Sequence, residues 1–314
     1  MKIKLLKILK SQAVLLLIVI IGLMVFISIM NPNFIGQQNI LAIGQQISVL
    51  GIATMAATLL LKSSLFDLSA SGIISLTCVL VAKFITDGLA VPLAVTIGIC
   101  ASFAMGCLNG TIISKTKTQP LIITLGMSYA YSGIALVLTG GVFIGLKGEF
   151  SFLGNGKVLG LPVSIIVMVI VVFLTFIVIR YTRYGRRLTA IGNNPEVTYL
   201  AGVNVDKYII LNYTICGGIF GLGGLVLLSR LGSVVAGVGA GYELRSIAAA
   251  IIGGVSITGG KGSVFGAFLG VILIGVLANG MNIMGVNSYY QNIVLGIVIV
   301  TAVIISNIDK IREK

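Results

Sequence analysis

The sequence predicts an all-α polytopic membrane protein with about ten transmembrane helices. Three observations support this prediction: the composition, the succession of apolar stretches and the distribution of the basic residues. Of the 314 residues, 57% are hydrophobic and only 9% are charged, and the mean hydropathy is +1.14. A soluble domain carries about 25% charged residues. This chain has too few to cover a globular surface, so we expect a bilayer around it.

Ten stretches are apolar enough to be membrane spans, each of which takes about 20 residues. They run over residues 12–30, 40–61, 67–84, 88–108, 120–140, 162–180, 208–228, 244–259, 263–281 and 289–306. The third and the eighth are short and are interrupted by small or polar residues. The first stretch is too long for a signal peptide and no small-residue cleavage site follows it, which favours a retained span.

The basic residues fall mostly on one side of these spans. If the N-terminus is cytoplasmic, ten spans return the C-terminus to the cytoplasm as well. Of the 21 Lys and Arg residues, those left on the outer side are then Lys83, Lys147, Lys157, Arg230 and Arg245. Basic residues concentrate in cytoplasmic loops. The net charge of +13 therefore needs no nucleic acid to explain it, and the chain carries no nucleic-acid-binding motif.

Ten spans divide into two halves of five. An odd number of spans reverses the orientation of the second half, which predicts a 5+5 inverted repeat of the kind common in transporters. The interrupted third and eighth spans then occupy matching places. Residues 1–314 are expected to form a single transmembrane domain.

The longest basic inner loop covers residues 180–207. It contains Asn194, Pro195 and Glu196, which together are typical of a helix start. A short amphipathic helix is predicted from about Pro195 to Ala201, ending at Gly202. The alternative is an irregular loop that returns to the membrane.

Four polar residues within or beside the spans are candidates for a substrate pathway. Asp67 begins the third span. An ionisable group is costly there unless it is paired or in contact with water, so its presence indicates a functional role. Asp67 and Ser69 are also good helix caps. Gln45 and Gln46 lie inside the second span, where buried amides need partners. Helix–helix contact is the alternative to a polar pathway lining.

Glu243 and Arg245 precede the eighth span. Two residues apart, they do not share a face of a helix. Each could have a partner of its own, or the two could form an exposed surface pair.

The stretch GGVSITGGKGSVFG, residues 253–266, is similar to a phosphate-binding loop but lacks two of its parts. Val255 stands at the place of the first glycine, and Gly262 at the place of the hydroxyl that would hold magnesium. The interpretation is a tight cytoplasmic turn formed by Gly253, Gly254, Gly259, Gly260 and Gly262. The spacing of two further glycine pairs, Gly217 with Gly221 and Gly266 with Gly270, predicts close helix packing.

The composition argues against an enzyme. The chain has no histidine, and its four cysteines form no C-x-x-C pair. No nucleophile–base pair, metal cluster or cofactor fingerprint is present, so no metal and no cofactor is expected. Three classes of transport protein remain open: a pore subunit driven by another protein, a self-sufficient secondary carrier, and a channel. A carrier usually shows intramembrane charges, and a channel shows a selectivity filter.

Five stretches resemble the permease subunits of bacterial sugar ATP-binding-cassette importers of the ribose, galactose, xylose and autoinducer-2 type. In chain order they are FDLSASG, SKTKTQPLIITLGMSYAYSGIALVLTGG, YGRRLTAIGNNPEVTYLAGVNVDK, GAGYELRSIAAAIIGGVSITGGKGSVFGAFLG and LANGMNIMGVNSYYQNIVLGIVIV. The resemblance covers nearly the whole chain. Related branched-chain amino-acid permeases share the fold, and their characteristic blocks match less well.

The resemblance implies partners and a location. Such permeases lie in the bacterial cytoplasmic membrane and pair as homodimers or heterodimers. A cytoplasmic ATPase docks beneath them, and an extracytoplasmic sugar-binding protein delivers the solute. The spacing from Glu196 to Gly202 matches the family's coupling loop, whose helix sits in a groove of the ATPase. Residues 180–207 would then be the coupling loop of a permease domain.

The sequence departs from the family near Ser64 and at Ser71, where glycine is usual. We expect a less kinked backbone at these two places, with an effect on substrate preference or on partner choice.

Overall fold

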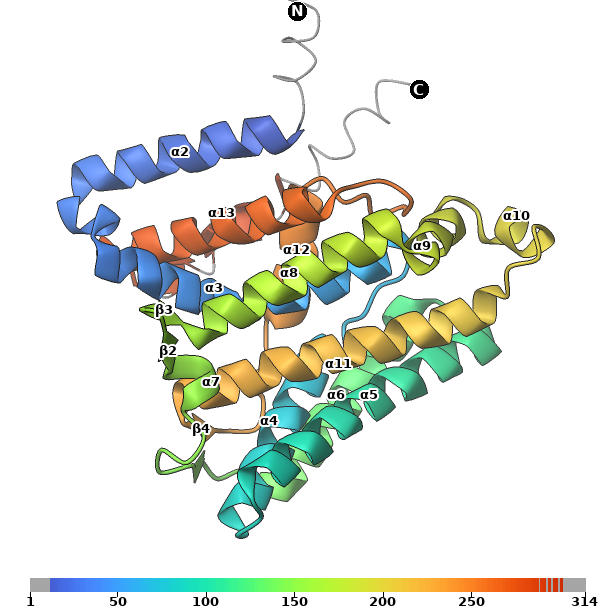
Figure 1. Ribbon diagram of the computed structural model, residues 1–314, viewed down its shortest axis with the longest axis horizontal. Helices are drawn as coiled ribbons and strands as arrows, with labels where there is room; N and C mark the ends of the chain where they lie inside the picture. The colour runs from blue at the N-terminus through green and yellow to red at the C-terminus, as the bar shows by residue number, and fades with distance from the viewer. Residues whose placement is uncertain (1–11, 288, 292, 295, 299, 302–314) are drawn as a thin grey trace, which may run out of the picture.

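The computed structural model describes residues 12–287 together with 289–291, 293–294, 296–298 and 300–301. Within them the chain is mostly helical (Figure 1). The longer helices are α2 (Gln12–Met30), α3 (Gln37–Lys62), α4 (Ala70–Thr86), α5 (Val91–Thr116), α6 (Pro120–Thr139), α8 (Val163–Tyr181), α11 (Val205–Leu231) and α13 (Val264–Ile283). The short elements are η1 (Pro32–Ile35), β1 (Ile144–Gly145), α7 (Phe152–Asn155), β2 (Lys157–Val158), β3 (Leu161–Pro162), α9 (Arg183–Asn193), α10 (Pro195–Leu200), β4 (Ser233–Val234) and α12 (Tyr242–Ile252).

Among the described residues, seven helices are long and apolar enough to cross a membrane: α2, α3, α5, α6, α8, α11 and α13. Helix α4 is shorter, with 17 residues. The predicted tenth span over 289–306 lies partly outside the described residues, and both chain termini lie wholly outside them. The molecule is therefore an all-α polytopic membrane protein.

The predicted eighth span over 244–259 is wrong as a full crossing. Helix α12 has 11 residues, which at about 1.5 Å per residue reach roughly half of the ~30 Å hydrocarbon core of a bilayer. The apolar run continues past the helix, but Gly254 takes a left-handed backbone with φ +86°. That conformation ends the helix.

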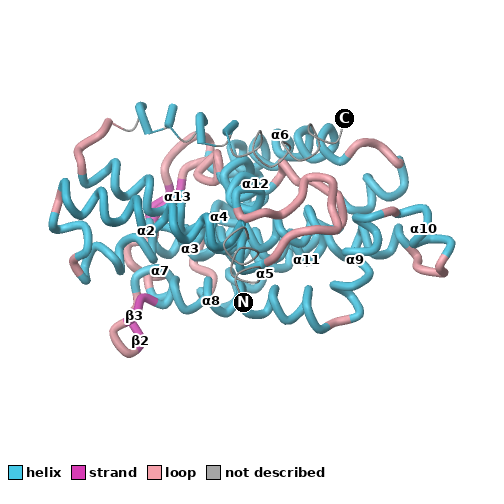
Figure 2. The backbone as a smooth tube through the Cα atoms, turned by 90° about the horizontal axis from the view of Figure 1, so that it is seen from above, coloured by secondary structure: helices cyan, strands magenta, loops and turns pink. Residues whose placement is uncertain are grey.

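The long helices run side by side between two ends of the molecule (Figure 1). At one end, here named the α7 end, lie α7 and the strands, with β1 paired to β4 and β2 to β3, both antiparallel. At the other end, named the α9–α10 end, lie α9 and α10. Seen from above, α6 and α8 lie at opposite edges of the molecule (Figure 2).

Burial separates central from peripheral helices. Of the most apolar 18-residue stretch of each helix, 67% is buried in α3 and in α13, and 61% in α11. In α2 and α6 the share is only 17%. The first three therefore form the core of the molecule, and α2 and α6 leave most of their surface for lipid or for a partner.

Glycines set the distance between neighbouring helices. Gly217 and Gly221 of α11 face Ser102 of α5, and a Cβ on either glycine would overlap atoms of that residue. Gly266 and Gly270 of α13 lie in the same way against the carbonyl oxygens at the C-terminal end of α12. Both pairs bring helix backbones into direct contact.

Candidate functional site

The chain breaks between α3 and α4, and Asp67 and Ser69 lie together in that break. The Asp67 Oδ1 accepts hydrogen bonds from the Ser69 backbone N–H at 2.7 Å and from the Ser69 hydroxyl at 2.5 Å. Both side chains are buried, Asp67 with an exposed fraction of 3%. Asp67 therefore accepts the hydrogen bonds of the Ser69 N–H and hydroxyl in the turn that starts α4.

A buried network surrounds this turn. The Asn109 amide of α5 donates to the Ser69 hydroxyl at 2.7 Å, and the Tyr131 hydroxyl of α6 donates to Asn109 Oδ1 at 2.9 Å. From α11, the Tyr213 hydroxyl donates to the carbonyl oxygen of Phe66 at 2.5 Å. The break is therefore held by three different helices.

Sequence reasoning missed Asn109, Tyr131 and Tyr213. An asparagine inside an apolar span was the one available signal, because a buried amide must find partners. The two tyrosines gave none, since tyrosine is common in membrane helices. The second Asp67 oxygen, Oδ2, is buried and has no hydrogen-bond partner among the described residues.

Gln45 and Gln46 belong to a different contact group, toward the α7 end of α3. Arg230, near the end of α11, donates to the carbonyl oxygens of Gln45 at 2.9 Å and of Gln46 at 3.4 Å. The Gln45 amide reaches the carbonyl oxygen of Gly154 in α7 at 3.5 Å. None of these contacts involves Asp67, so the four candidate pathway residues fall into two separate groups.

Glu243 and Arg245 stand in the first turns of α12, and both are half-buried. One carboxylate oxygen of Glu243 is buried without a hydrogen-bond partner among the described residues. The alternative of an exposed surface pair therefore does not hold.

The helix predicted over 195–201 is α10. Asn194 caps it, because its Oδ1 accepts from the backbone N–H groups of Glu196 at 2.9 Å and Val197 at 3.0 Å. Ala201 follows the last helical residue, and Gly202 has φ +82°. Such a left-handed backbone favours glycine.

Helix α10 turns apolar side chains toward solvent. Val197, Tyr199 and Leu200 are exposed by 60%, 68% and 81%. Exposed apolar side chains on a helix that projects beyond the membrane spans are typical of a protein interaction surface.

Helix α9 precedes α10 and was not expected from the sequence. Thr182 caps it by accepting from the Gly185 N–H at 3.1 Å. The Tyr184 hydroxyl donates to Asn212 Oδ1 of α11 at 3.1 Å. Burial raises the pKa of Tyr184 well above its ordinary value, so the phenol remains a neutral donor. Helix α9 is thereby fixed to the membrane part of the protein.

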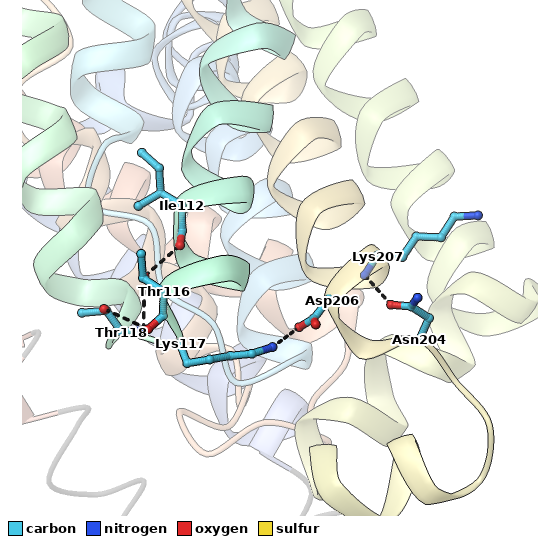
Figure 3. Close-up of polar contacts among 7 residues, drawn as sticks. All are labelled: Ile112, Thr116, Lys117, Thr118, Asn204, Asp206 and Lys207. Carbon is cyan, nitrogen blue, oxygen red and sulfur yellow. Dashed lines mark hydrogen bonds and ion pairs between the residues drawn. The ribbon is translucent and has the colours of Figure 1, made fainter.

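The start of α11 is tied to the turn between α5 and α6 (Figure 3). Lys117 extends from the end of α5 and forms an ion pair with Asp206, in the first turn of α11. Asn204 caps α11 by accepting from the Lys207 N–H at 3.0 Å. Lys117 itself has a left-handed backbone, φ 53°, which ends α5.

Ser64 corrects an expectation drawn from the sequence. A less kinked backbone was expected because serine replaces the usual glycine. The structure gives Ser64 φ 58°, the left-handed conformation that glycine adopts freely. The kink is therefore kept despite the serine side chain. Ser71 lies in the first turn of α4, and its hydroxyl is 3.0 Å from that of Ser128 in α6.

Comparison with known proteins decides the family. The family model described as "Branched-chain amino acid transport system / permease component" matches residues 39–303. The chain belongs to this permease family. It is accordingly a multi-pass membrane transport subunit.

The permease is similar to proteins that import sugars. It is 36% identical over 286 residues to the ribose import permease protein of Bacillus subtilis, covering 90% of this chain and 89% of that protein. It is 34% identical to the D-allose transport system permease protein of Escherichia coli, covering 89% and 86%, and 32% identical to the fructose import permease protein of Rhizobium meliloti, covering 93% and 84%. The resemblance to sugar permeases is thus confirmed. No solved structure matches this chain significantly.

Proposed function

We propose that this permease is the membrane-spanning subunit of an ATP-binding-cassette importer that translocates a sugar or sugar-like solute. The similarity to the ribose permease, at 36% identity over 90% of the chain, is the observation that supports this function. The expected alternative is a branched-chain amino-acid permease. The description of the matching family model supports it, but the three relatives described above are named as permeases for ribose, allose and fructose. A self-sufficient carrier is disfavoured by the scarcity of intramembrane charge.

We infer that a cytoplasmic ATPase docks on α10. Its apolar side chains Val197, Tyr199 and Leu200 are exposed, and they would be covered by a groove of the ATPase. Asn194, Pro195, Glu196, Ala201 and Gly202 shape the two ends of the helix. The α9–α10 end is then cytoplasmic, and an extracytoplasmic sugar-binding protein approaches the α7 end.

A second permease, identical or homologous, is proposed to pack on the edge that carries α6. That helix lies at one edge of the molecule (Figure 2), and only 17% of its apolar window is buried. A pathway between two permeases would then pass close to the break that α6 helps to hold.

Asp67, Ser69, Gln45 and Gln46 are proposed to contribute to that pathway in different ways. Gln46 is exposed and can meet a solute directly. Asp67 and Ser69 are buried and act indirectly, by holding the start of α4 in place. Replacement of Asp67 by alanine should impair transport more than assembly, because the turn has other supports. If transport and assembly fall together, only the capping role is left.

An inverted repeat is proposed for the helices around the two breaks. Helices α3 and α11 have 26 and 27 residues, and each leads through an irregular segment into a shorter helix. Helix α3 packs on α12 and α13, as α11 packs on α4 and α5. Helix α3 ends toward α9 and α11 ends toward α7, as inversion requires. Rocking of one half against the other is the alternating access known for such repeats.

The function is tested by reconstitution in liposomes with a candidate ATPase and binding protein. Uptake of labelled ribose, allose, fructose and leucine is measured with and without ATP. We expect ATP-dependent uptake of a sugar and none of leucine. Uptake by the permease alone on an ion gradient would overturn the assignment to an ATP-driven importer, and uptake of leucine alone would favour the amino-acid alternative.

A further inference from the structure

At the α9–α10 end, three chain segments meet in one place, which we name the cytoplasmic junction. It consists of Lys62 and Ser64 at the end of α3, Gly192 in the last turn of α9, and Thr258 and Gly260 of the loop between α12 and α13. The Gly260 N–H donates to the Lys62 carbonyl oxygen at 3.1 Å, and the Lys62 ammonium donates to the Gly260 carbonyl oxygen at 3.1 Å. The loop is thus paired to the end of α3 at two points.

The Ser64 hydroxyl joins the other two segments. Its oxygen lies 3.0 Å from the carbonyl oxygen of Gly192 and 2.7 Å from that of Thr258. A hydroxyl carries one proton, so Ser64 shares that proton between a carbonyl of α9 and a carbonyl of the loop. Ser64 holds its left-handed backbone with a Cβ present, which is unfavourable for residues other than glycine.

Glycines make this contact close. A Cβ on Gly192 would overlap the Lys62 carbonyl oxygen, and one on Gly259 would overlap the Ser64 hydroxyl. A Cβ on Gly260 would overlap the amide oxygen of Asn193. The segments therefore touch through their backbones, with little room for one to move without the others.

A second tie fixes the other end of α9 to the same part of α3. Tyr184 donates to Asn212, and the Asn212 amide donates in turn to the Leu59 carbonyl oxygen at 3.1 Å and to the Ser63 hydroxyl at 2.9 Å. Asn212 is fully buried. Helix α9 is thus fastened to the end of α3 at both of its ends.

Each segment of the junction leads to an element that the transport cycle needs. Gly192 is followed by Asn194, the cap of α10. Ser64 is followed by the break that holds Asp67 and starts α4. The loop around Thr258 and Gly260 joins the half-length helix α12 to α13. A displacement of α10 therefore reaches both broken helices through one point.

We propose that the Ser64 hydroxyl is a positioning group that transmits the movement of α10 to α4 and to the α12–α13 loop together. This inference rests on the proposed docking of an ATPase on α10. Ser64 contacts neither solute nor nucleotide in this role. Its loss should uncouple ATP hydrolysis from transport without releasing the ATPase.

Two variants separate the hydroxyl from the backbone strain. Ser64→Ala removes the hydroxyl and keeps a Cβ in the left-handed backbone, whereas Ser64→Gly removes the hydroxyl and relieves the strain. Thr111→Val is the control, because Thr111 is half-buried and, among the described residues, its hydroxyl bonds within its own helix, to the Cys107 carbonyl oxygen at 2.7 Å. Each variant is purified with its ATPase, reconstituted with the binding protein, and assayed for sugar uptake and ATP hydrolysis.

We expect both Ser64 variants to bind the ATPase and to hydrolyse ATP at the rate of the unchanged protein. The amount of sugar transported per ATP should fall about fivefold or more, because typical coupling free energies between two sites correspond to factors of that size. Thr111→Val should keep the full ratio. The inference is overturned if both variants keep the ratio, or if only Ser64→Ala loses it, since strain and not the hydroxyl would then be responsible. A parallel loss of transport, hydrolysis and melting temperature would show a purely structural role. Failure of the unchanged permease to bind the ATPase would instead refute the proposed function.

Discussion

Asn109 connects more helices around the break between α3 and α4 than Asp67 does, because Asp67 bonds to Ser69 alone among the described residues. Its amide donates to Ser69, and its oxygen accepts from Tyr131, so one side chain connects α4, α5 and α6. It is fully buried. A buried polar group stabilises only while its partners are present, because an unsatisfied donor or acceptor carries the whole cost of desolvation.

Asn109→Leu should therefore lower the free energy of unfolding by about 1–3 kcal/mol, because it leaves the Ser69 and Tyr131 hydroxyls with fewer partners. An SDS titration in mixed micelles measures this change. Thr111→Val, on the same helix, should change it by less than about 0.5 kcal/mol, because this half-buried hydroxyl bonds to the Cys107 carbonyl oxygen of its own helix and takes no part in the buried network. Equal effects of the two substitutions would contradict the role given to Asn109.

At the scale of elements, the contact between α5 and α11 depends on the absence of side chains. A Cβ on Gly106 would overlap the Tyr213 carbonyl oxygen and approach Gly217 at 3.0 Å. Small residues allow such close approach of membrane helices, which associate mainly through packing and interhelical hydrogen bonds. The same contact keeps Tyr213 in reach of Phe66 in the break.

Gly106→Ala should destabilise the protein by about 1–3 kcal/mol, the usual cost of overpacking. The matched control is Gly22→Ala in α2, where a Cβ would meet nothing within 4 Å. That change should be neutral or stabilising, because alanine is the better helix former. Thermal unfolding in detergent compares the two variants. A stabilising Gly106→Ala would refute the close contact.

Helix α10 combines capped ends with an apolar surface that none of the described residues covers. Leu200→Asp places a charge where docking would desolvate it, and this should abolish pull-down of the ATPase. The fold should be unaffected, because Leu200 is 81% exposed. Leu159→Asp is the control, since Leu159 is 99% exposed and lies between β2 and β3 at the other end of the molecule. Retention of the ATPase by Leu200→Asp would contradict docking on α10.

At the scale of the whole molecule, long-range ties connect parts that are distant in sequence. The junction joins α3, α9 and the α12–α13 loop, and the pair of Lys117 and Asp206 joins the α5–α6 turn to α11. The first tie is partly buried and the second is exposed. Their contributions to stability should differ accordingly.

Asp206→Asn should lower the free energy of unfolding by less than about 1 kcal/mol, as is usual for exposed ion pairs. Salt screens exposed charges, so the effect should vanish at high ionic strength. Unfolding titrations at low and high salt measure it. A larger loss that salt does not change would show that the pair is structurally more important than its exposure implies.

The sequence by itself determined the membrane class, the places of the longer helices α2 to α6, α8, α11 and α13, the short helix after Asn194 and the family, because apolar length, capping residues and motif spacing are local properties. Only the tertiary structure decided that the eighth stretch is half a crossing, that Ser64 keeps the left-handed backbone, and that Asn109, Tyr131 and Tyr213 hold the break in which Asp67 lies. It also separated Gln45 and Gln46 from Asp67. These features depend on which backbones approach each other in space, and neither apolar length nor residue spacing encodes that.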